Sequence, residues 1–302
     1  MTILDFTKLC RQFGSDSRFC QGPGGNISIK KSSFEILIKA SGCALANVST
    51  TEGFVKVNTQ KIESYIAKEL YSTRVLGQQY DDELNYLIDS ETISLPNKTN
   101  KSSIETAMHC YFQPKFVAHL HPIHLNILLC SEEGQSIANH IFGDASYNWV
   151  EFVPPGFYLA QKIAQKCDLT NEKMRLPILL ANHGLIISGD KIDEIFALAQ
   201  YFDSASLDFL GSKGLAVSFA DWQKKWSFKK NLNEQHLFPD TVVFETSSPP
   251  SLVAESIFCA SDFIEFAITL VGLTPRYISL LDCQYIKEMS REKYRQKIAR
   301  EK

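Results

Sequence analysis

KFVAHLHP, residues Lys115 to Pro122, is the segment that decides the predicted fold and points to a functional site. An apolar run that ends at a proline indicates a strand. Because alternate residues of a strand point to the same face, the imidazoles of His119 and His121 are presented together at its end. Pro122 favours a position at an edge of the sheet, where we expect a site.

Further strand patterns occur on both sides of this segment. They are predicted within Gly22–Lys30, Glu35–Gly42, Phe54–Asn58, Trp149–Gly156, Leu176–Asp190 and Thr241–Phe244. Helical spacing occurs in Ile3–Phe13, Thr59–Leu70, Asp81–Leu87, Phe157–Cys167, Lys191–Leu210 and Tyr285–Lys302. Strands and helices alternate irregularly and several strands are adjacent. We therefore predict an α/β layered sheet with antiparallel pairing rather than a strict βαβ array.

The composition excludes several classes of partner. The chain has 302 residues, of which 44% are hydrophobic and 22% charged, as in ordinary globular proteins. The formal net charge is -3, so there is no electrostatic footprint for nucleic acid or an anionic membrane. The eight cysteines include no C-x-x-C pair, which favours free thiols over a disulfide framework. Without a signal-peptide pattern or a membrane-spanning run, a cytoplasmic protein is expected.

A third histidine strengthens the interpretation of the His119–His121 pair. His183 lies at a glycine-bounded corner between two apolar runs, where its side chain can be aimed at a pocket. Three imidazoles with one open position are typical of a catalytic zinc site. A lone H-x-H pair on a strand more often faces solvent or forms hydrogen bonds, so the pair alone does not establish a metal site.

Glu105 has two interpretations. It lies in KSSIETAMH, next to a predicted helix start, where a carboxylate commonly caps the helix. The alternative is a general acid or base that faces a metal and whose pKa is adjusted by charge and burial. The residues alone favour the cap.

Two small-residue turns could bind a phosphate or a polyol. Gly24 to Lys30 supplies glycine amides, the amide of Asn26, a hydroxyl and a cation within a few residues. Ala40-Ser41-Gly42 is a second, weaker candidate. Glycine turns before strands are common, so neither turn is specific by itself.

Taken in order, these segments resemble the class II aldolase/adducin family over roughly residues 1 to 212. The matching motifs are GGNIS (Gly24 to Ser28), Ser41-Gly42, SSIE (Ser102 to Glu105), His119-x-His121, PGFYLA (Pro155 to Ala160) and Asn182-His183-Gly184. The chain is most similar to the branch that contains the aldolase part of bifunctional rhamnulose-phosphate aldolase/dehydrogenase proteins, and the closing EKYRQK (Glu292 to Lys297) is also similar. No G-x-G-x-x-G fingerprint follows, so a fused dehydrogenase half is not expected.

The resemblance implies a three-layer α/β/α fold with a mainly antiparallel central sheet. It implies a catalytic domain over residues 1–212 and an extension over 213–302 that packs on this domain or on a neighbouring subunit. Family members usually form rings of four subunits. The resemblance therefore implies a homo-oligomer, for which a tetramer is the form usual in the family. A tyrosine from the neighbour or from the C-terminal segment often completes the site, and the sequence does not rank Tyr147, Tyr285 and Tyr294.

The resemblance also assigns roles to residues. His119, His121 and His183 are the implied ligands of a divalent metal, with Zn²⁺ placed first and Mn²⁺, Fe²⁺ or Co²⁺ as alternatives. Glu105 is the implied proton shuttle. The implied phosphate-binding residues are Gly25, Asn26, Ser41, Gly42 and Ser103, with help from Lys30 or Lys101. Many members have a second serine directly before the glutamate, where this chain has Ile104, so phosphate binding is less secure than metal binding.

The implied reaction is the cleavage of a ketose phosphate, or of a related sugar, through a metal-stabilised enediolate. The same machinery supports epimerisation, dehydration and decarboxylation of sugar phosphates, and the sequence does not separate these reactions. A different class is an adducin-like binding protein that has kept the fold without the chemistry. Retention of the three histidines and Glu105 argues against it.

Overall fold

The histidine-bearing strand lies near the middle of the sheet. The computed structural model describes residues 3–70, 77–93, 100–167, 176–228, 235–245 and 251–300. The strands in these ranges are β1 (Asn26–Ser32), β2 (Glu35–Lys39), β3 (Phe54–Asn58), β4 (Thr92–Ile93), β5 (Phe116–Leu120), β6 (Asn148–Val150), β7 (Ile178–Leu180) and β8 (Gly184–Gly189). They form one sheet in the order β4-β3-β2-β1-β5-β8-β7-β6. The position at an edge of the sheet, which Pro122 favoured, is therefore wrong: β5 has a neighbour on both sides and all five of its residues are buried.

The predicted antiparallel character of the sheet is confirmed. Among the described strands, the pairs β1–β2, β2–β3, β3–β4, β1–β5, β5–β8 and β7–β8 are antiparallel. The pair β6–β7 is parallel, so the sheet is mixed. The prediction for Thr241–Phe244 is wrong: this segment lies in and directly after the short helix α10 (Pro239–Val243), which starts at a proline and has Asp240 in its first turn. Both residues favour a helix start over a strand.

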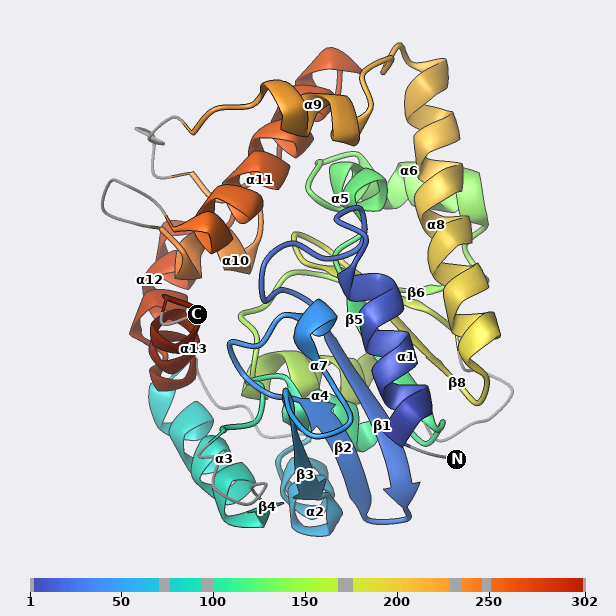
Figure 1. Ribbon diagram of the computed structural model, residues 1–302. Helices are drawn as coiled ribbons and strands as arrows, with labels where there is room; N and C mark the ends of the chain where they lie inside the picture. Colours follow the sequence, from blue (N-terminus) through green and yellow to red (C-terminus); the bar gives the residue numbers. More distant parts are fainter. Residues whose placement is uncertain are drawn as a thin grey trace.

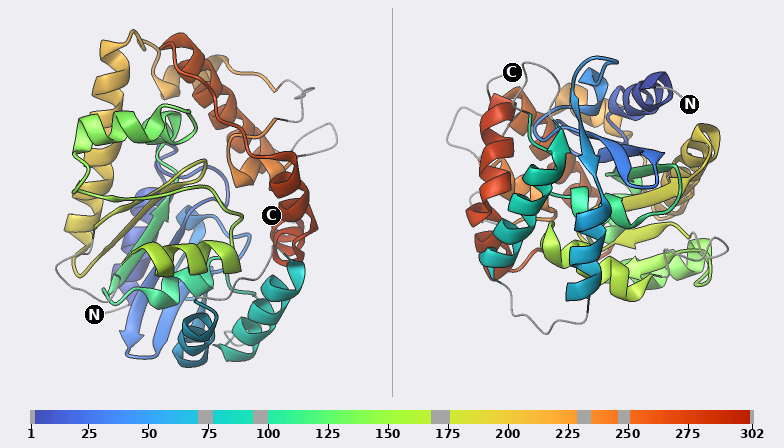
Figure 2. Two further views of the ribbon diagram at one scale, coloured as in Figure 1. Left: turned by 180° about the vertical axis from the view of Figure 1, so that it is seen from behind. Right: turned by 90° about the horizontal axis from the view of Figure 1, so that it is seen from below.

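Helices cover both faces of the sheet, which makes the three layers. The described helices are α1 (Ile3–Gly14), α2 (Gln60–Glu69), α3 (Gln78–Glu91), α4 (Thr106–Tyr111), α5 (Ile123–Leu129), α6 (Gly134–Phe142), α7 (Phe157–Lys166), α8 (Ile192–Ser212), α9 (Phe219–Lys225), α10, α11 (Leu252–Leu270), α12 (Leu280–Glu288) and α13 (Ser290–Arg300). Helices α1 and α8 lie on one face, and α2, α4 and α7 lie on the other (Figures 1 and 2). The predicted α/β/α layering is therefore confirmed.

The C-terminal helices pack along one side of the layered region. In Figure 1 they run from α9 past α11 and α10 to α12 and α13, and the start of α13 lies beside α3. Their apolar side chains form a second core with residues of the first part of the chain, namely Ile104, Ile123, Ile127, Leu128 and Cys130. An ion pair of 2.9 Å between Arg291 and Asp89 joins α13 to α3. The domain boundary between residues 212 and 213 stays a prediction.

Two expectations from composition can be compared with the structure. All eight cysteines are free and buried, as the spacing predicted. Among the described residues, no helix has both the length and the apolar character that are needed to cross a membrane.

Asp81 connects three helices. From α3, its carboxylate accepts the Phe157 N–H at 2.8 Å at the start of α7 and the phenol of Tyr285 on α12. Gly156 has φ +100, and a Cβ at this position would collide with the same carboxylate, so the turn before α7 requires glycine. Burial raises the pKa of Asp81 to about 6, because the charged form loses its hydration.

We expect Asp81 to make the stability of the fold depend on pH. The pKa of Asp81 is raised in the folded state. Asp81 therefore makes its full contribution to the stability of the fold below its ordinary pKa, and this contribution is lost as the pH rises through about 6. Between pH 5 and pH 8, the free energy of unfolding of the wild type relative to Asp81→Asn should fall by roughly 1 kcal/mol. Urea unfolding of both proteins at several pH values measures this difference, and parallel pH profiles would contradict it.

Candidate active site

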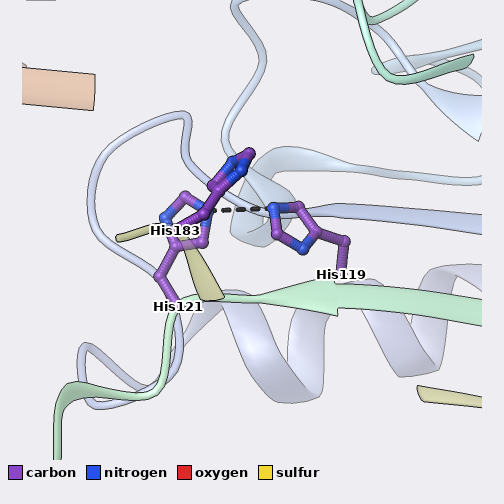
Figure 3. A group of neighbouring side chains, drawn as sticks. All are labelled: His119, His121 and His183. Atoms are coloured by element: carbon purple, nitrogen blue, oxygen red, sulfur yellow. Dashed lines mark hydrogen bonds between the residues drawn. The ribbon is translucent and has the colours of Figure 1, made fainter. Parts of the chain in front are cut away.

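Three histidines from two places in the sheet meet at one point. His119 is on β5, His121 directly follows it, and His183 lies in the turn between β7 and β8. One nitrogen of each ring lies within 4.8 Å of those of the other two, and all three residues are buried (Figure 3). The structure thus brings together the three residues that the sequence interpretation selected as metal ligands, while their role as ligands stays a prediction.

The turn that carries His183 depends on its two neighbours. Asn182 has φ +53, a left-handed conformation that asparagine tolerates better than most residues. Its amide donates to the carbonyls of Leu237 at 2.8 Å and Arg276 at 2.7 Å, which ties the turn to the C-terminal region. A Cβ on Gly184 would overlap the carbonyl oxygen of Leu120, so only glycine lets the turn lie this close to β5.

Hydrogen bonds and burial prepare the rings for a cation. The His119 Nδ1 lies 3.3 Å from the Leu185 carbonyl, which can only accept a hydrogen bond, so Nδ1 carries the proton and Nε2 keeps its lone pair. The Nε2 atoms of His119 and His121 are 3.1 Å apart, as the dashed line in Figure 3 marks. Burial lowers the pKa of His121 to about 3 and also lowers that of His183. Both rings are therefore neutral near pH 7, the form that binds metals.

Glu105 does not cap its helix. It is the residue before α4, but its side chain makes no capping hydrogen bond, so the interpretation that the residues alone favoured is wrong. Its Oε1 lies 3.2 Å from the His119 Nε2 and 3.3 Å from the His183 Nε2. Burial would raise the pKa of Glu105, but the electrostatic interaction with the nearby His119 and His183 rings outweighs it and lowers the pKa well below its ordinary value. The carboxylate is thus ionised and faces the histidines.

A small cavity of about 20 Å³ lies beside the histidines. Its lining consists of Pro23, Gly25, Lys39, Ser41, Gly42, Ser103, Ile104, Glu105, His121, Pro155, His183, Pro239, Asp240, Glu292 and Arg295. This volume holds about one water molecule, so a sugar needs the walls to move apart. A larger cleft of about 440 Å³ lies between α9 and α11, but its walls are mainly apolar and include none of the three histidines.

Most of the predicted phosphate-binding residues are close to the histidines. Gly25, Ser41, Gly42 and Ser103 line the cavity. Asn26 is paired with His119 across β1 and β5, so both side chains lie on the sheet face that α4 covers. Neither amide atom of Asn26 has a hydrogen-bond partner among the described residues, and the Ser41 hydroxyl also has none there.

The two predicted lysines are not at the cavity. Lys30 is four residues along β1 from Asn26, roughly 13 Å away at the rise of a strand, and it is not part of the lining. Lys101 pairs with Asp89 at 3.1 Å and lies over the Tyr294 ring. The structure therefore does not bring these lysines to the predicted phosphate site.

Four charged residues of the lining were missed by the sequence interpretation. Lys39 is buried at the end of β2 and donates to the carbonyls of Pro23 at 2.8 Å and Cys43 at 2.9 Å. The sequence signal that could have pointed to Lys39 is its position at the end of the apolar run EILIK. The other three are Asp240 on α10 and Glu292 and Arg295 on α13. The similarity of EKYRQK pointed to the last two, and no motif pointed to Asp240.

The three candidate tyrosines are not part of the cavity lining. Tyr147 donates to the Asn139 side chain at 2.6 Å, and Tyr285 donates to Asp81. Tyr294 lies beside Lys101. A contribution from a neighbouring subunit stays a prediction.

Replacement of Gly184 by alanine should disturb the site through its backbone. The added Cβ would overlap the Leu120 carbonyl oxygen and lie 2.9 Å from the His121 Cδ2, so the turn must move away from β5. We expect a loss of roughly 1–3 kcal/mol in the free energy of unfolding. Gly211→Ala is the control, because its Cβ meets no described side chain within 4 Å and alanine favours a helix. Urea unfolding of both variants tests this, and equal stabilities would contradict it.

The fold is similar to that of solved class II aldolase structures. The N-terminal class II aldolase domain of a conserved protein from Thermoplasma acidophilum has 20% identity and a TM-score of 0.57, covering 70% of this chain and 94% of that one. A sugar-phosphate aldolase from Thermotoga maritima has 16% identity and a TM-score of 0.50, covering 72% of this chain and 96% of that one. At these identities the likeness concerns the fold alone.

The sequence itself identifies the family. A Bacillus subtilis (strain 168) protein named "Uncharacterized oxidoreductase YuxG" is 30% identical over 186 residues, which are 59% of this chain and 25% of that protein. The chain thus spans about a quarter of the length of this relative. The family model described as "Class II Aldolase and Adducin N-terminal domain" matches residues 5–207. Because this match covers more than half of the chain, the protein belongs to the class II aldolase and adducin N-terminal domain family.

Proposed function

We propose that this protein is a metal-dependent aldolase that cleaves a carbon–carbon bond of a ketose phosphate or a related sugar. The observation that carries the proposal is the convergence of three buried imidazoles and one buried carboxylate beside a cavity. The name of the Thermotoga maritima structure, a sugar-phosphate aldolase, supports this substrate class.

The residues present fit a divalent cation. Two ligands of a tetrahedral zinc ion are roughly 3.3 Å apart, and the Nε2 atoms of His119 and His121 are 3.1 Å apart. Three nitrogen donors leave a coordination position for a substrate, as in catalytic zinc sites. His119, His121 and His183 would hold the ion, Zn²⁺ in the first place and Mn²⁺, Fe²⁺ or Co²⁺ as alternatives. When bound, the cation supplies Lewis-acid polarisation of a ketose carbonyl.

Glu105 is the proposed base of the reaction. Its carboxylate is 8% exposed, so water competes little for the proton that it takes up. Its Oε1 is within 3.3 Å of two of the imidazoles, which puts it next to any carbonyl group held there. From this position the carboxylate can move a proton to and from the donor carbon of the sugar.

Polar groups near the histidines suit the phosphate. The Asn26 amide and the Ser41 hydroxyl are buried groups without described partners, and such groups favour a polar ligand. Gly25, Gly42 and Ser103 are the other proposed contacts. Lys39 lines the cavity, whereas Lys30 and Lys101 do not. Lys39 is therefore the better candidate for a positive charge next to the phosphate.

Epimerisation, dehydration and decarboxylation of sugar phosphates remain alternatives on the same site. An adducin-like binding protein is the alternative from another class. The position of Glu105 favours an enzyme, because a binding protein has no need of a carboxylate that makes no helix cap and instead faces two of the imidazoles.

His119→Ala should remove the bound metal. The purified wild type should hold about one divalent ion per chain after dialysis, and the variant should hold little, since only two imidazoles remain. Elemental analysis of both proteins measures this. His140→Ala is the matched control, because His140 is an exposed histidine on α6. Stoichiometric metal in His119→Ala would refute the ligand assignment, and a wild type that takes up no metal after reloading would favour the binding protein.

Glu105→Gln should keep the metal and lose turnover. The amide preserves the shape of the side chain but cannot take up a proton, so the turnover number should fall on the order of 100- to 10,000-fold. The measurement is aldehyde release from a panel of ketose 1-phosphates, together with metal content. Glu194→Gln, a change at an exposed carboxylate on α8, should leave both unchanged. Wild-type turnover in Glu105→Gln would refute the role of this residue.

A further inference from the structure

Two complementary buried atoms next to the histidines lack hydrogen-bond partners among the described residues. They are the His121 Nδ1 and the Asp240 Oδ2. The two atoms are 3.5 Å apart, and both side chains are 4% exposed. A buried ring nitrogen and a buried carboxylate oxygen each cost free energy when they stay unpaired. Their pairing needs a shift of about 0.7 Å, since a charge-assisted N–H···O bond is typically about 2.8 Å long.

The rest of the Asp240 carboxylate is held by α13. The Arg295 Nη2 lies 2.7 Å from the Asp240 Oδ1, and its Nη1 lies 3.3 Å from Glu292. Arg295 therefore occupies one carboxylate oxygen and leaves the other turned to His121. Burial would raise the pKa of Asp240, but the Arg295 charge outweighs it and lowers the pKa, so the carboxylate stays ionised.

Gly24 leaves the space in which the two groups approach each other. A Cβ at this position would lie 2.6 Å from the Asp240 Oδ2 and 3.0 Å from the His121 Nδ1. Any larger residue at position 24 would stand between the ring and the carboxylate. The first glycine of GGNIS thus has a steric role that is separate from phosphate binding.

We propose that Asp240 is a positioning residue for His121: it accepts a hydrogen bond from the Nδ1–H group and thereby directs the Nε2 lone pair to the metal. The proposal rests on the metal site of the proposed function. A carboxylate behind a ligating histidine fixes its tautomer and its orientation and makes the ring a better donor. His119 has the equivalent support from the Leu185 carbonyl. The C-terminal region thereby acts on the metal site of its own chain.

The test is the zinc affinity of metal-free protein, measured by competition with a chromophoric chelator. We expect Asp240→Ala to weaken zinc binding by about 10- to 100-fold. Asp240→Asn, which keeps the shape and loses the charge, should weaken it by a smaller factor. This readout does not depend on substrate or turnover.

A second buried carboxylate–histidine pair provides the matched control. The Asp203 Oδ2 lies 2.9 Å from the His124 Nδ1, and Asp203 is 2% exposed, but neither residue is part of the cavity lining. Asp203→Asn should keep the zinc affinity of the wild type even where it lowers stability. The unfolding temperature of each metal-free variant separates the loss of folding from the loss of zinc binding.

The outcomes distinguish this inference from the proposed function. A wild type that binds no zinc refutes the metal site itself. A wild type that binds zinc, together with a folded Asp240 variant of equal affinity, overturns the inference and leaves the metal site intact. If Asp240→Ala does not fold, the zinc affinity of Asp240→Asn is the deciding measurement. A zinc affinity of Asp240→Asn equal to that of the wild type then overturns the inference. An equal loss of affinity in Asp203→Asn also overturns it, because the effect would then not be specific to Asp240.

Discussion

The antiparallel pairing of β5 with β8 is the interaction on which the arrangement of the site depends. The register pairs His119 with Ile186 and Leu120 with Leu185, so the turn before β8 lies next to the end of β5. The lack of a side chain at Gly184 allows this close approach. A slip by one residue would turn His119 to the other face of the sheet, because the side-chain period of a strand is two. The backbone pairing of two buried strands therefore brings three imidazoles together before any ligand contributes energy.

Much of this arrangement could be predicted from local patterns. The period of two in the segment after Lys115 correctly predicted a strand that presents both histidines, and the glycine-bounded corner correctly predicted that His183 sits at a turn. The role of Glu105 was harder to predict, because a carboxylate directly before a helix commonly caps that helix. Only its neighbours in the structure show that the side chain points to His119 instead. Local propensity also gave a wrong prediction at Thr241–Phe244. The apolar and β-branched residues there indicated a strand, but the segment follows a proline that starts a helix.

Asp240 and Arg295 could not be placed from the sequence for a different reason. Asp240 meets His121 across more than a hundred residues, and neither residue belongs to a repeating pattern that links the two segments. Contacts of this kind depend on how the C-terminal helices dock, which periodicity does not encode. Lys30 illustrates the opposite error: it is close in sequence to Asn26, but the extended chain carries it away from the cavity.

The contacts of Asp240 and Arg295 also link two equilibria in the molecule. Asp240 and Arg295 belong to helices α10 and α13, whereas His121 belongs to the end of the central strand. If the docked helices increase the affinity for a cation by some factor, thermodynamic reciprocity requires the cation to stabilise the docked helices by that same factor. Occupancy of the histidines and docking of helices α10 and α13 are then one coupled property. Hydrogen exchange in α10 and α13 would slow when the centre is filled, although neither helix supplies a ligand.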